Sequence, residues 1–166
     1  PKNEFFPGNW AGAINSFWRI KEFENKTDSG WNMEMEAPPL TNAASIEELM
    51  NYPWSDNNWF DYSDLREKLE SWKDFSIMAS GASVFQHATY LRGMDTLMMD
   101  MMINPDAAHF VLNKFTDFYF EYFRRMFDVA GDLIDVFALA DDFGMQNTLL
   151  IGPEMFDEFV APRLKK

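Results

Sequence analysis

The chain has 166 residues and a net charge of −13, from 27 acidic against 14 basic side chains. This acidity argues against nucleic acids and anionic membrane surfaces as partners, because both are bound mainly through Lys and Arg. The sequence contains no cysteine, which excludes disulfides and thiolate zinc ligands and fits a cytoplasmic protein, and no apolar stretch approaches the roughly 18 residues of a membrane-spanning helix.

Residues 1–40 are predicted to form an irregular, aromatic segment that contains one hairpin. Two short strands are expected around a turn over residues 25–30, because turn-forming residues separate two stretches of strand-like alternation. Residues 41–166 are then expected to alternate helices and strands. No linker or repeat divides the sequence, so residues 1–166 are predicted to form a single domain.

Two short helices are expected after this segment. Ser45 and Glu48 have the spacing of a capping box, in which the serine side chain accepts a backbone N–H of the first turn. The helix that they start is expected to end at Pro53. A second helix is predicted over residues 61–75, with its leucines and Trp72 on one apolar side.

A buried strand is predicted over residues 75–83, where an apolar run ends in small residues. A long helical pattern follows over residues 85–103 and is interrupted by Gly93. Asn104 is expected to cap the next helix and Pro105 to open it, because proline is well tolerated at the first helical position.

The clearest element is a helix over residues 105–131, because apolar residues recur there at every third or fourth position. A second strand is predicted over residues 133–140, and a final helix begins at Pro153. Strands separated by long helices indicate an α/β fold with a parallel sheet. Ligand sites in such sheets lie beyond the carboxyl ends of the strands, which here are residues 79–83 and 141–147.

The loop after the second strand carries the main candidates for a functional site. Its sequence, FALADDFGMQN, places two carboxylates directly after an apolar run, where an ionised group is costly to bury without a partner. The carboxylates either accept backbone N–H groups in a turn, or one of them projects into a ligand site. The position at a strand end favours the second reading, so Asp141, Asp142 and Gln146 are predicted as catalytic residues.

The loop and helix after the first strand are predicted to supply the substrate-binding residues. Ser80, Gly81 and Phe85 would form an adjoining wall of the site. His87 and Tyr90 lie three residues apart and share one helix face, although a lone histidine is more often a structural hydrogen-bonding residue. No set of His, Cys and Glu has the spacing of metal ligands, so no metal site is predicted.

Four stretches match a known family in the same order. The last, VFALADDFGMQNTLLIGPEMFDEFVAPRLKK at 136–166, has an acidic strand end, a Gly-x-Gln turn and a following Gly-Pro-x-x-Phe. The others are PPLTNAASIEELMNYPWSD at 38–56, IMASGASVFQHATYLRGMDTLMMDMMINPD at 77–106 and AGDLIDVF at 130–137. With these motifs the chain resembles the uroporphyrinogen decarboxylase-like (URO-D) superfamily over most of its length after about residue 30.

The resemblance implies a (β/α)8 TIM barrel of the URO-D type, with its site at the carboxyl ends of the strands. Such a barrel takes about 250 residues. The 166-residue chain is therefore expected to be a partial barrel, the central part of a longer one, in which the opening strand and the closing half are absent.

The resemblance leaves two enzyme activities open. Decarboxylases of the family remove carboxyl groups from a tetrapyrrole without a cofactor, and related methyltransferases use a methylated corrinoid and a zinc-activated thiol. Decarboxylases tend to have Gly-Ala-Pro-Trp-Thr in the first loop, whereas this chain has Gly81-Ala82-Ser83-Val84-Phe85. That departure and the Asp141-Asp142 pair favour a corrinoid-linked methyltransferase.

The expected cofactors and partners follow from the same resemblance. No cofactor is expected to be bound by this segment alone, and zinc and a corrinoid are expected if the full-length protein is a methyltransferase. The expected partners are a small-molecule, tetrapyrrole or corrinoid ligand and a corrinoid protein, and a homodimer stays open. An alternative of another class is a non-catalytic fragment that associates with another chain.

Overall fold

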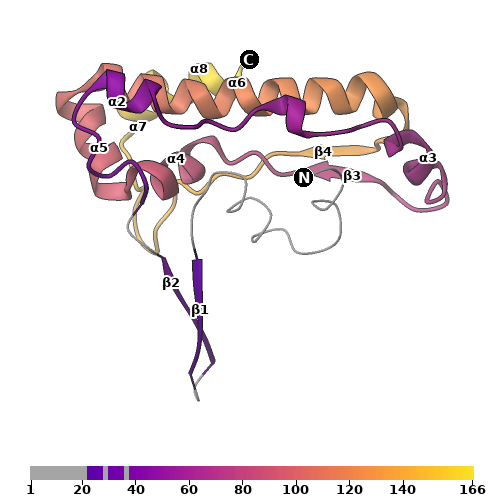
Figure 1. Cartoon of the computed structure of the whole chain (residues 1–166), viewed down its shortest axis with the longest axis horizontal. Helices are drawn as coiled ribbons and strands as arrows, with labels where there is room; N and C mark the ends of the chain where they lie inside the picture. The colour runs from indigo at the N-terminus through magenta and orange to yellow at the C-terminus, as the bar shows by residue number, and fades with distance from the viewer. Residues whose placement is uncertain (1–21, 28–29, 36–37) are drawn as a thin grey trace.

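The computed structural model describes residues 22–27, 30–35 and 38–166, so residues 1–21 of the irregular segment expected over residues 1–40 lie outside the described part. Figure 1 labels most of the elements. In chain order they are β1 (Glu22–Thr27), β2 (Gly30–Met35), α2 (Ile46–Met50), η1 (Asn57–Trp59), α3 (Leu65–Glu70), β3 (Met78–Ser80), α4 (Val84–Arg92), α5 (Met94–Ile103), α6 (Pro105–Ala130), η2 (Gly131–Leu133), β4 (Val136–Ala138), α7 (Pro153–Met155), η3 (Phe156–Val160) and α8 (Ala161–Leu164).

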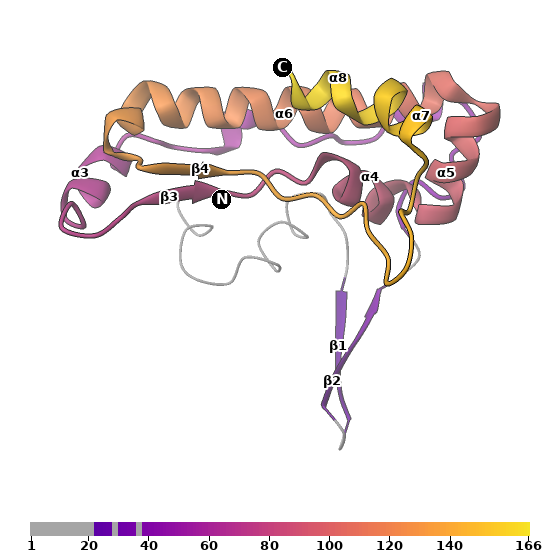
Figure 2. The same ribbon diagram turned by 180° about the vertical axis from the view of Figure 1, so that it is seen from behind.

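The predicted hairpin is present as the antiparallel pair β1 and β2. Its strands run closer to the turn than the sequence indicated, because Thr27 pairs with Gly30. Residues 25–27, which were expected in the turn, therefore belong to β1. Figures 1 and 2 both show the hairpin projecting away from the rest of the chain.

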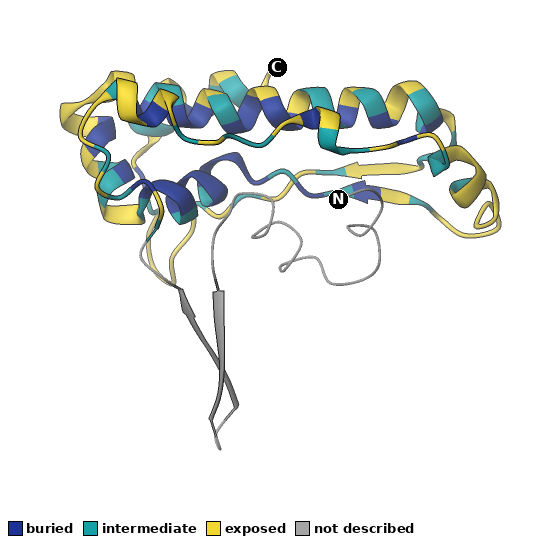
Figure 3. Ribbon diagram, viewed as in Figure 1, coloured by how far each residue is buried: buried dark blue, intermediate teal, exposed yellow. Residues whose placement is uncertain are grey.

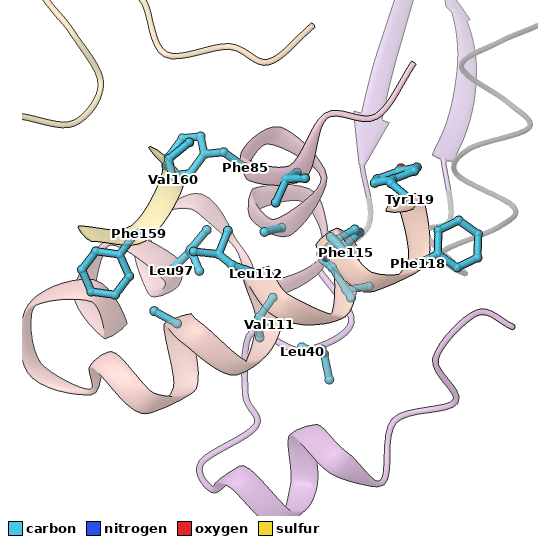
Figure 4. Packing of buried hydrophobic residues seen from close by; sticks show 14 of the residues in the cluster. Leu40, Phe85, Leu97, Val111, Leu112, Phe115, Phe118, Tyr119, Phe159 and Val160 are labelled. Atoms are coloured by element: carbon cyan, nitrogen blue, oxygen red, sulfur yellow. The ribbon is translucent and has the colours of Figure 1, made fainter. Parts of the chain in front are cut away.

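Helix α6 is the longest described helix, and it confirms the clearest sequence prediction. It has 26 residues, with Pro105 at its first position. One of its faces carries the centre of the core, which Figure 3 shows as a buried stripe along the helix. Figure 4 shows side chains from α4, α5 and the C-terminal helix gathered against this face. The fully covered side chains of α6 include Ala108, Val111, Leu112 and Phe115.

Strands β3 and β4 form the predicted parallel pair, in which Met78 faces Val136 and Ser80 faces Ala138. Each strand is shorter than predicted, because the regular pairing covers only three residues. The expectation of a buried strand from residue 75 is wrong: Met78 is 60% exposed, and only Ala79 of β3 is buried. In the described part of the chain the sheet has just these two strands, so no neighbouring strand covers them.

Helices α4 and α5 meet at Gly93, as the sequence predicted. The glycine has φ +88°, a conformation that side chains with a Cβ rarely adopt. Next to it, Arg92 forms a buried ion pair with Asp100, at 2.7 Å from Nε to Oδ2. The Arg92 guanidinium also donates to the carbonyls of Leu40 and Ala43. This network fastens the segment before α2 to the α4–α5 corner.

The capping box at Ser45 is confirmed, since the Glu48 amide donates to the serine Oγ at 3.2 Å. The apolar side predicted for the next helix is only partly correct. Trp72 is 60% exposed, because α3 ends at Glu70 and the indole then lies against Phe75, which is itself exposed, instead of the core. Asn104 occupies the capping position of α6, but its side chain makes no capping hydrogen bond.

The C-terminal helical segment begins at Pro153, as predicted, and passes through one wider turn, η3, before α8. Figure 2 shows it lying along α6. Phe159 and Val160 bury their side chains against the core. Arg163 then donates to Asn113 Oδ1 at 2.7 Å and to the His109 carbonyl at 3.2 Å. These bonds hold the end of the segment on α6.

Candidate functional site

The carboxyl ends of the two parallel strands bring the predicted site loops together. Beyond β3, the Gly81 amide donates to the Ala138 carbonyl at the end of β4, at 3.3 Å. The Ser83 hydroxyl donates to the Ala140 carbonyl in the same way. The two strand-end loops, residues 80–83 and 139–147, are thus joined side by side, as expected for a parallel α/β sheet.

A sharp backbone turn directs the first loop into α4. Gly81 has φ +125° and Ala82 has φ +56°, and Ala82 is the one non-glycine residue with positive φ in the described part of the chain. A non-glycine residue in this region costs of the order of 1 kcal/mol. The turn allows α4 to start at Val84, with its first amides facing the loop after β4.

Asp141 caps the start of α4 with both carboxylate oxygens. Its Oδ2 accepts the Phe85 amide at 2.7 Å and its Oδ1 accepts the Gln86 amide at 2.8 Å. These N–H groups have no partner within the helix, and a negative charge is favourable at a helix N-terminus. Burial raises the pKa of Asp141, although the hydrogen bonds from these amides lower it. The carboxylate is thereby committed to the protein's own backbone.

Asp142 and Gln146 are both exposed to solvent. The Asp142 Oδ1 receives only a long hydrogen bond, 3.4 Å, from the Gly144 amide. The following residues fold back on themselves, since Met145 donates to the Thr148 carbonyl at 2.8 Å and a bridge joins Gly144 to Leu149. This small turn presents the Gln146 side chain at its tip. The two adjacent aspartates therefore have different surroundings, one turned to a helix and one to solvent.

Phe85 is buried on the core side of the strand-end loops and does not lie on their surface. It is 1% exposed, and its ring contacts Phe143 at a centroid distance of 5.4 Å. Phe143 contacts Phe156 of the C-terminal segment at 5.3 Å. This row of rings supports the loop after β4 from below. Whether Phe85 reaches a ligand stays a prediction, as does the role predicted for Ser80 and Gly81.

His87 is turned into the core toward α6. Its Nδ1 lies 2.6 Å from the Tyr119 hydroxyl, and the residue is 5% exposed. Burial lowers the pKa of His87 to about 4, so its imidazole is neutral at pH 7. Tyr90, one turn further along α4, has its hydroxyl 2.9 Å from the Gln86 Nε2, which donates to it. The two predicted residues lie close together, with ring centroids 6.1 Å apart.

Sequence reasoning did not single out Ser83, Gln86 and Tyr119. A serine directly before a helix is a common capping residue, but the Ser83 side chain makes no capping hydrogen bond and donates to the Ala140 carbonyl instead. Gln86 and Tyr119 carried no signal in the sequence, because their roles depend on contacts with Tyr90 and His87 that only the folded chain brings together.

The described residues offer no set of ligands for a zinc ion. The described residues contain no group of three or more His, Cys, Asp or Glu side chains that could hold a metal, and the whole sequence lacks cysteine.

A hollow of about 330 Å³ lies away from the strand-end loops, between α6 and the C-terminal segment. Its lining includes His109, Asp117, Arg163 and Lys166. None of the predicted site residues lines it. No helix in the described residues has the length and hydropathy to cross a membrane.

The sequence profile of the family described as uroporphyrinogen decarboxylase (URO-D) matches residues 38–166. The chain belongs to this family. The match covers both strand-end loops and every helix in the described residues, and it confirms the resemblance seen in the sequence. A search of curated proteins gives no significant match.

A methyltransferase from Methanosarcina mazei has a similar structure, with a TM-score of 0.55 and 16% sequence identity. The alignment covers 91% of this chain and 44% of the methyltransferase, so the chain spans less than half the length of that relative. At this identity the similarity shows the fold. Together with the family membership it confirms the predicted fold class, an α/β barrel of the URO-D type that is present here in part.

Proposed function

We propose that this chain forms the ligand-binding strand-end region of a corrinoid-linked methyltransferase of the URO-D family. The observation that carries the proposal is the charge of the two joined loops. They present the exposed carboxylate of Asp142, and no Lys or Arg occurs in residues 75–91 or 134–152. Two basic residues flank the first of these stretches: Arg92 is buried against Asp100, and Lys73 precedes β3 at the opposite end of the strands.

This charge supports a corrinoid rather than a porphyrinogen as the ligand of these loops. A porphyrinogen with several carboxylates requires cationic side chains around it, because like charges brought together are repelled. The strand-end loops would instead place Asp142 against those carboxylates. A corrinoid carries amide groups at its rim, and these offer N–H donors to a carboxylate and carbonyl acceptors to a glutamine. Asp142 and Gln146 fit that set.

The roles of the residues follow from this fit. Asp142 would accept hydrogen bonds from amide groups of the ligand, and Gln146 would both donate and accept. The bound corrinoid would supply the methyl-carrying chemistry. The described residues hold no set of zinc ligands, so their proposed roles do not involve that metal. The structural similarity to the methyltransferase from Methanosarcina mazei supports the proposal of a methyltransferase over that of a decarboxylase.

The test is a titration of the 166-residue chain with hydroxocobalamin, followed by absorbance and isothermal calorimetry. Binding is expected, and Asp142→Asn is expected to weaken it about tenfold, because a hydrogen bond to a charged acceptor is worth about 1.5–3 kcal/mol. Asp74→Asn is the matched control: it removes the same charge from an exposed residue before β3, at the opposite end of the strands. Binding of uroporphyrin in preference to hydroxocobalamin would contradict the proposal, as would binding of neither.

A second candidate function is association with another chain. It is favoured by large apolar side chains that are exposed on and around the two-stranded sheet, namely Phe75, Met78, Val136 and Leu139. The described part of the sheet offers strand edges on which further strands could pair. Light scattering after gel filtration tests whether the chain associates with a second copy of itself. A monomer at micromolar concentration would count against this second function.

A further inference from the structure

We infer that Asp141 is a positioning residue, which locks the loop after β4 onto the start of α4 and thereby sets the orientation of Asp142 toward a ligand. The inference rests on the proposed function only in assigning the ligand to Asp142. It separates the roles of two adjacent aspartates that the sequence alone leaves interchangeable.

The geometry of Asp141 commits most of the acceptor capacity of its carboxylate to backbone amides. Both oxygens accept amides of α4, at 2.7 and 2.8 Å. The Oδ1 also accepts the amide of Asp142 at 3.2 Å. Three backbone N–H groups that bind one carboxylate fix its position and its orientation. Asp141 therefore acts on the backbone rather than on a bound molecule.

The contacts of Asp141 and of the first turn of α4 also fix the backbone that leads to the exposed residues Asp142 and Gln146. The bond from the Asp142 amide ties that residue's backbone directly to the capping carboxylate. The next residue, Phe143, rests on Phe85, whose own amide donates to Asp141. The segment that leads to Gln146 is thus anchored at its base by one polar and one aromatic contact, and both of these reach the first turn of α4.

Hydrogen exchange measured by NMR on the whole chain tests this inference. Asp141→Asn has nearly the same shape, but its amide group can accept only one of the two α4 amides and presents a donor to the other. Exchange at Phe85 and Gln86 is expected to become about tenfold faster, since a charge-assisted hydrogen bond is lost. The resonances of residues 142–147 are expected to move, and hydroxocobalamin binding to weaken.

Ser83→Ala is the matched control, because it removes a different bond between the same two loops, from the Ser83 hydroxyl to the Ala140 carbonyl. A general loosening of the fold would alter residues 142–147 equally in both variants, and this result would overturn the positioning role. Unchanged exchange at Phe85 and Gln86 in Asp141→Asn would also overturn it. Weaker cobalamin binding without any change at those amides would make Asp141 a direct ligand contact instead.

A second measurement needs no variant at position 141. When the pH of the native chain is lowered into the acid range, the Phe85 and Gln86 amide resonances are expected to shift together as their shared acceptor is protonated. The same joint shift is expected in Asp142→Asn and in His87→Gln, which removes the titration of the neighbouring imidazole. Independent or absent shifts would refute the lock. If the native chain binds no hydroxocobalamin, the proposed function fails, yet these exchange and titration results still decide whether Asp141 positions the loop.

Discussion

Protonation of His87 is expected to destabilise the fold in mild acid. The imidazole is 5% exposed and lies between α4 and α6, with its Nδ1 at 2.6 Å from the Tyr119 hydroxyl. Its ring also lies near Phe115, at a centroid distance of 6.3 Å. A positive charge at this place would be surrounded by aromatic side chains and removed from water, which is the cause of the lowered pKa.

The magnitude follows from the difference between the ordinary pKa of 6.5 and the value of about 4 in the folded chain. At about 1.36 kcal/mol per pKa unit, this difference corresponds to roughly 3 kcal/mol. The unfolded chain takes up the proton first as the pH falls, so the free energy of unfolding decreases between about pH 6.5 and pH 4. Above this window both states are neutral at His87, and below it both are protonated.

Urea unfolding at a series of pH values measures this contribution, with His87→Gln as the reference. The glutamine variant keeps a polar side chain without the titration, so the difference between the two stability curves cancels most of the effect of the many carboxylates. The difference is expected to change by about 3 kcal/mol between pH 6.5 and pH 4. A constant difference across that window would refute the burial of a neutral imidazole at this position.

Two further variants test the α4–α5 corner. Arg92→Met is expected to lower the free energy of unfolding by about 3–5 kcal/mol, because it leaves the buried carboxylate of Asp100 without its partner. Gly93→Ala is expected to cost about 1–3 kcal/mol, since φ is +88° and an added Cβ would lie 3.1 Å from the Thr41 Oγ1. Both values are measured by urea unfolding at pH 7.

Each of these variants has a control within the chain. The double variant Arg92→Met/Asp100→Leu is expected to recover much of the lost stability, because an apolar pair can replace a buried ion pair. Gly144→Ala is expected to change stability by less than about 0.5 kcal/mol, since an added Cβ there meets nothing within 4 Å. Equal losses at Gly93 and Gly144, or a double variant as unstable as Arg92→Met, would contradict the structural explanation.

The sequence predicts helix α6 and the break at Gly93 well, because both depend on local patterns. Apolar residues at every third or fourth position determine which face of α6 is buried. A glycine between two helical runs marks the change of direction. The parallel pairing of β3 with β4 was also predictable, since long helices separate the two strands.

The extent of the strands and the surroundings of single side chains were not predictable in this way. The apolar residues from Phe75 onward indicated a buried strand, but β3 begins only at Met78. The length of a strand depends on how much of it pairs with a neighbouring strand, and the sequence of the strand itself does not show this. Asp141 and Asp142 are chemically identical in the sequence. Only the position of α4 shows that one of them caps a helix while the other faces solvent.

We propose that Asp142 and Gln146 face a corrinoid at the joined strand-end loops. An NMR titration of the labelled chain with hydroxocobalamin tests it most directly, because the shifted amides show where the ligand lies. Shifts are expected in residues 80–83 and 142–147, and none around Asp74 at the opposite end of the strands. Shifts confined to other surfaces, or unchanged binding in Asp142→Asn, would contradict it.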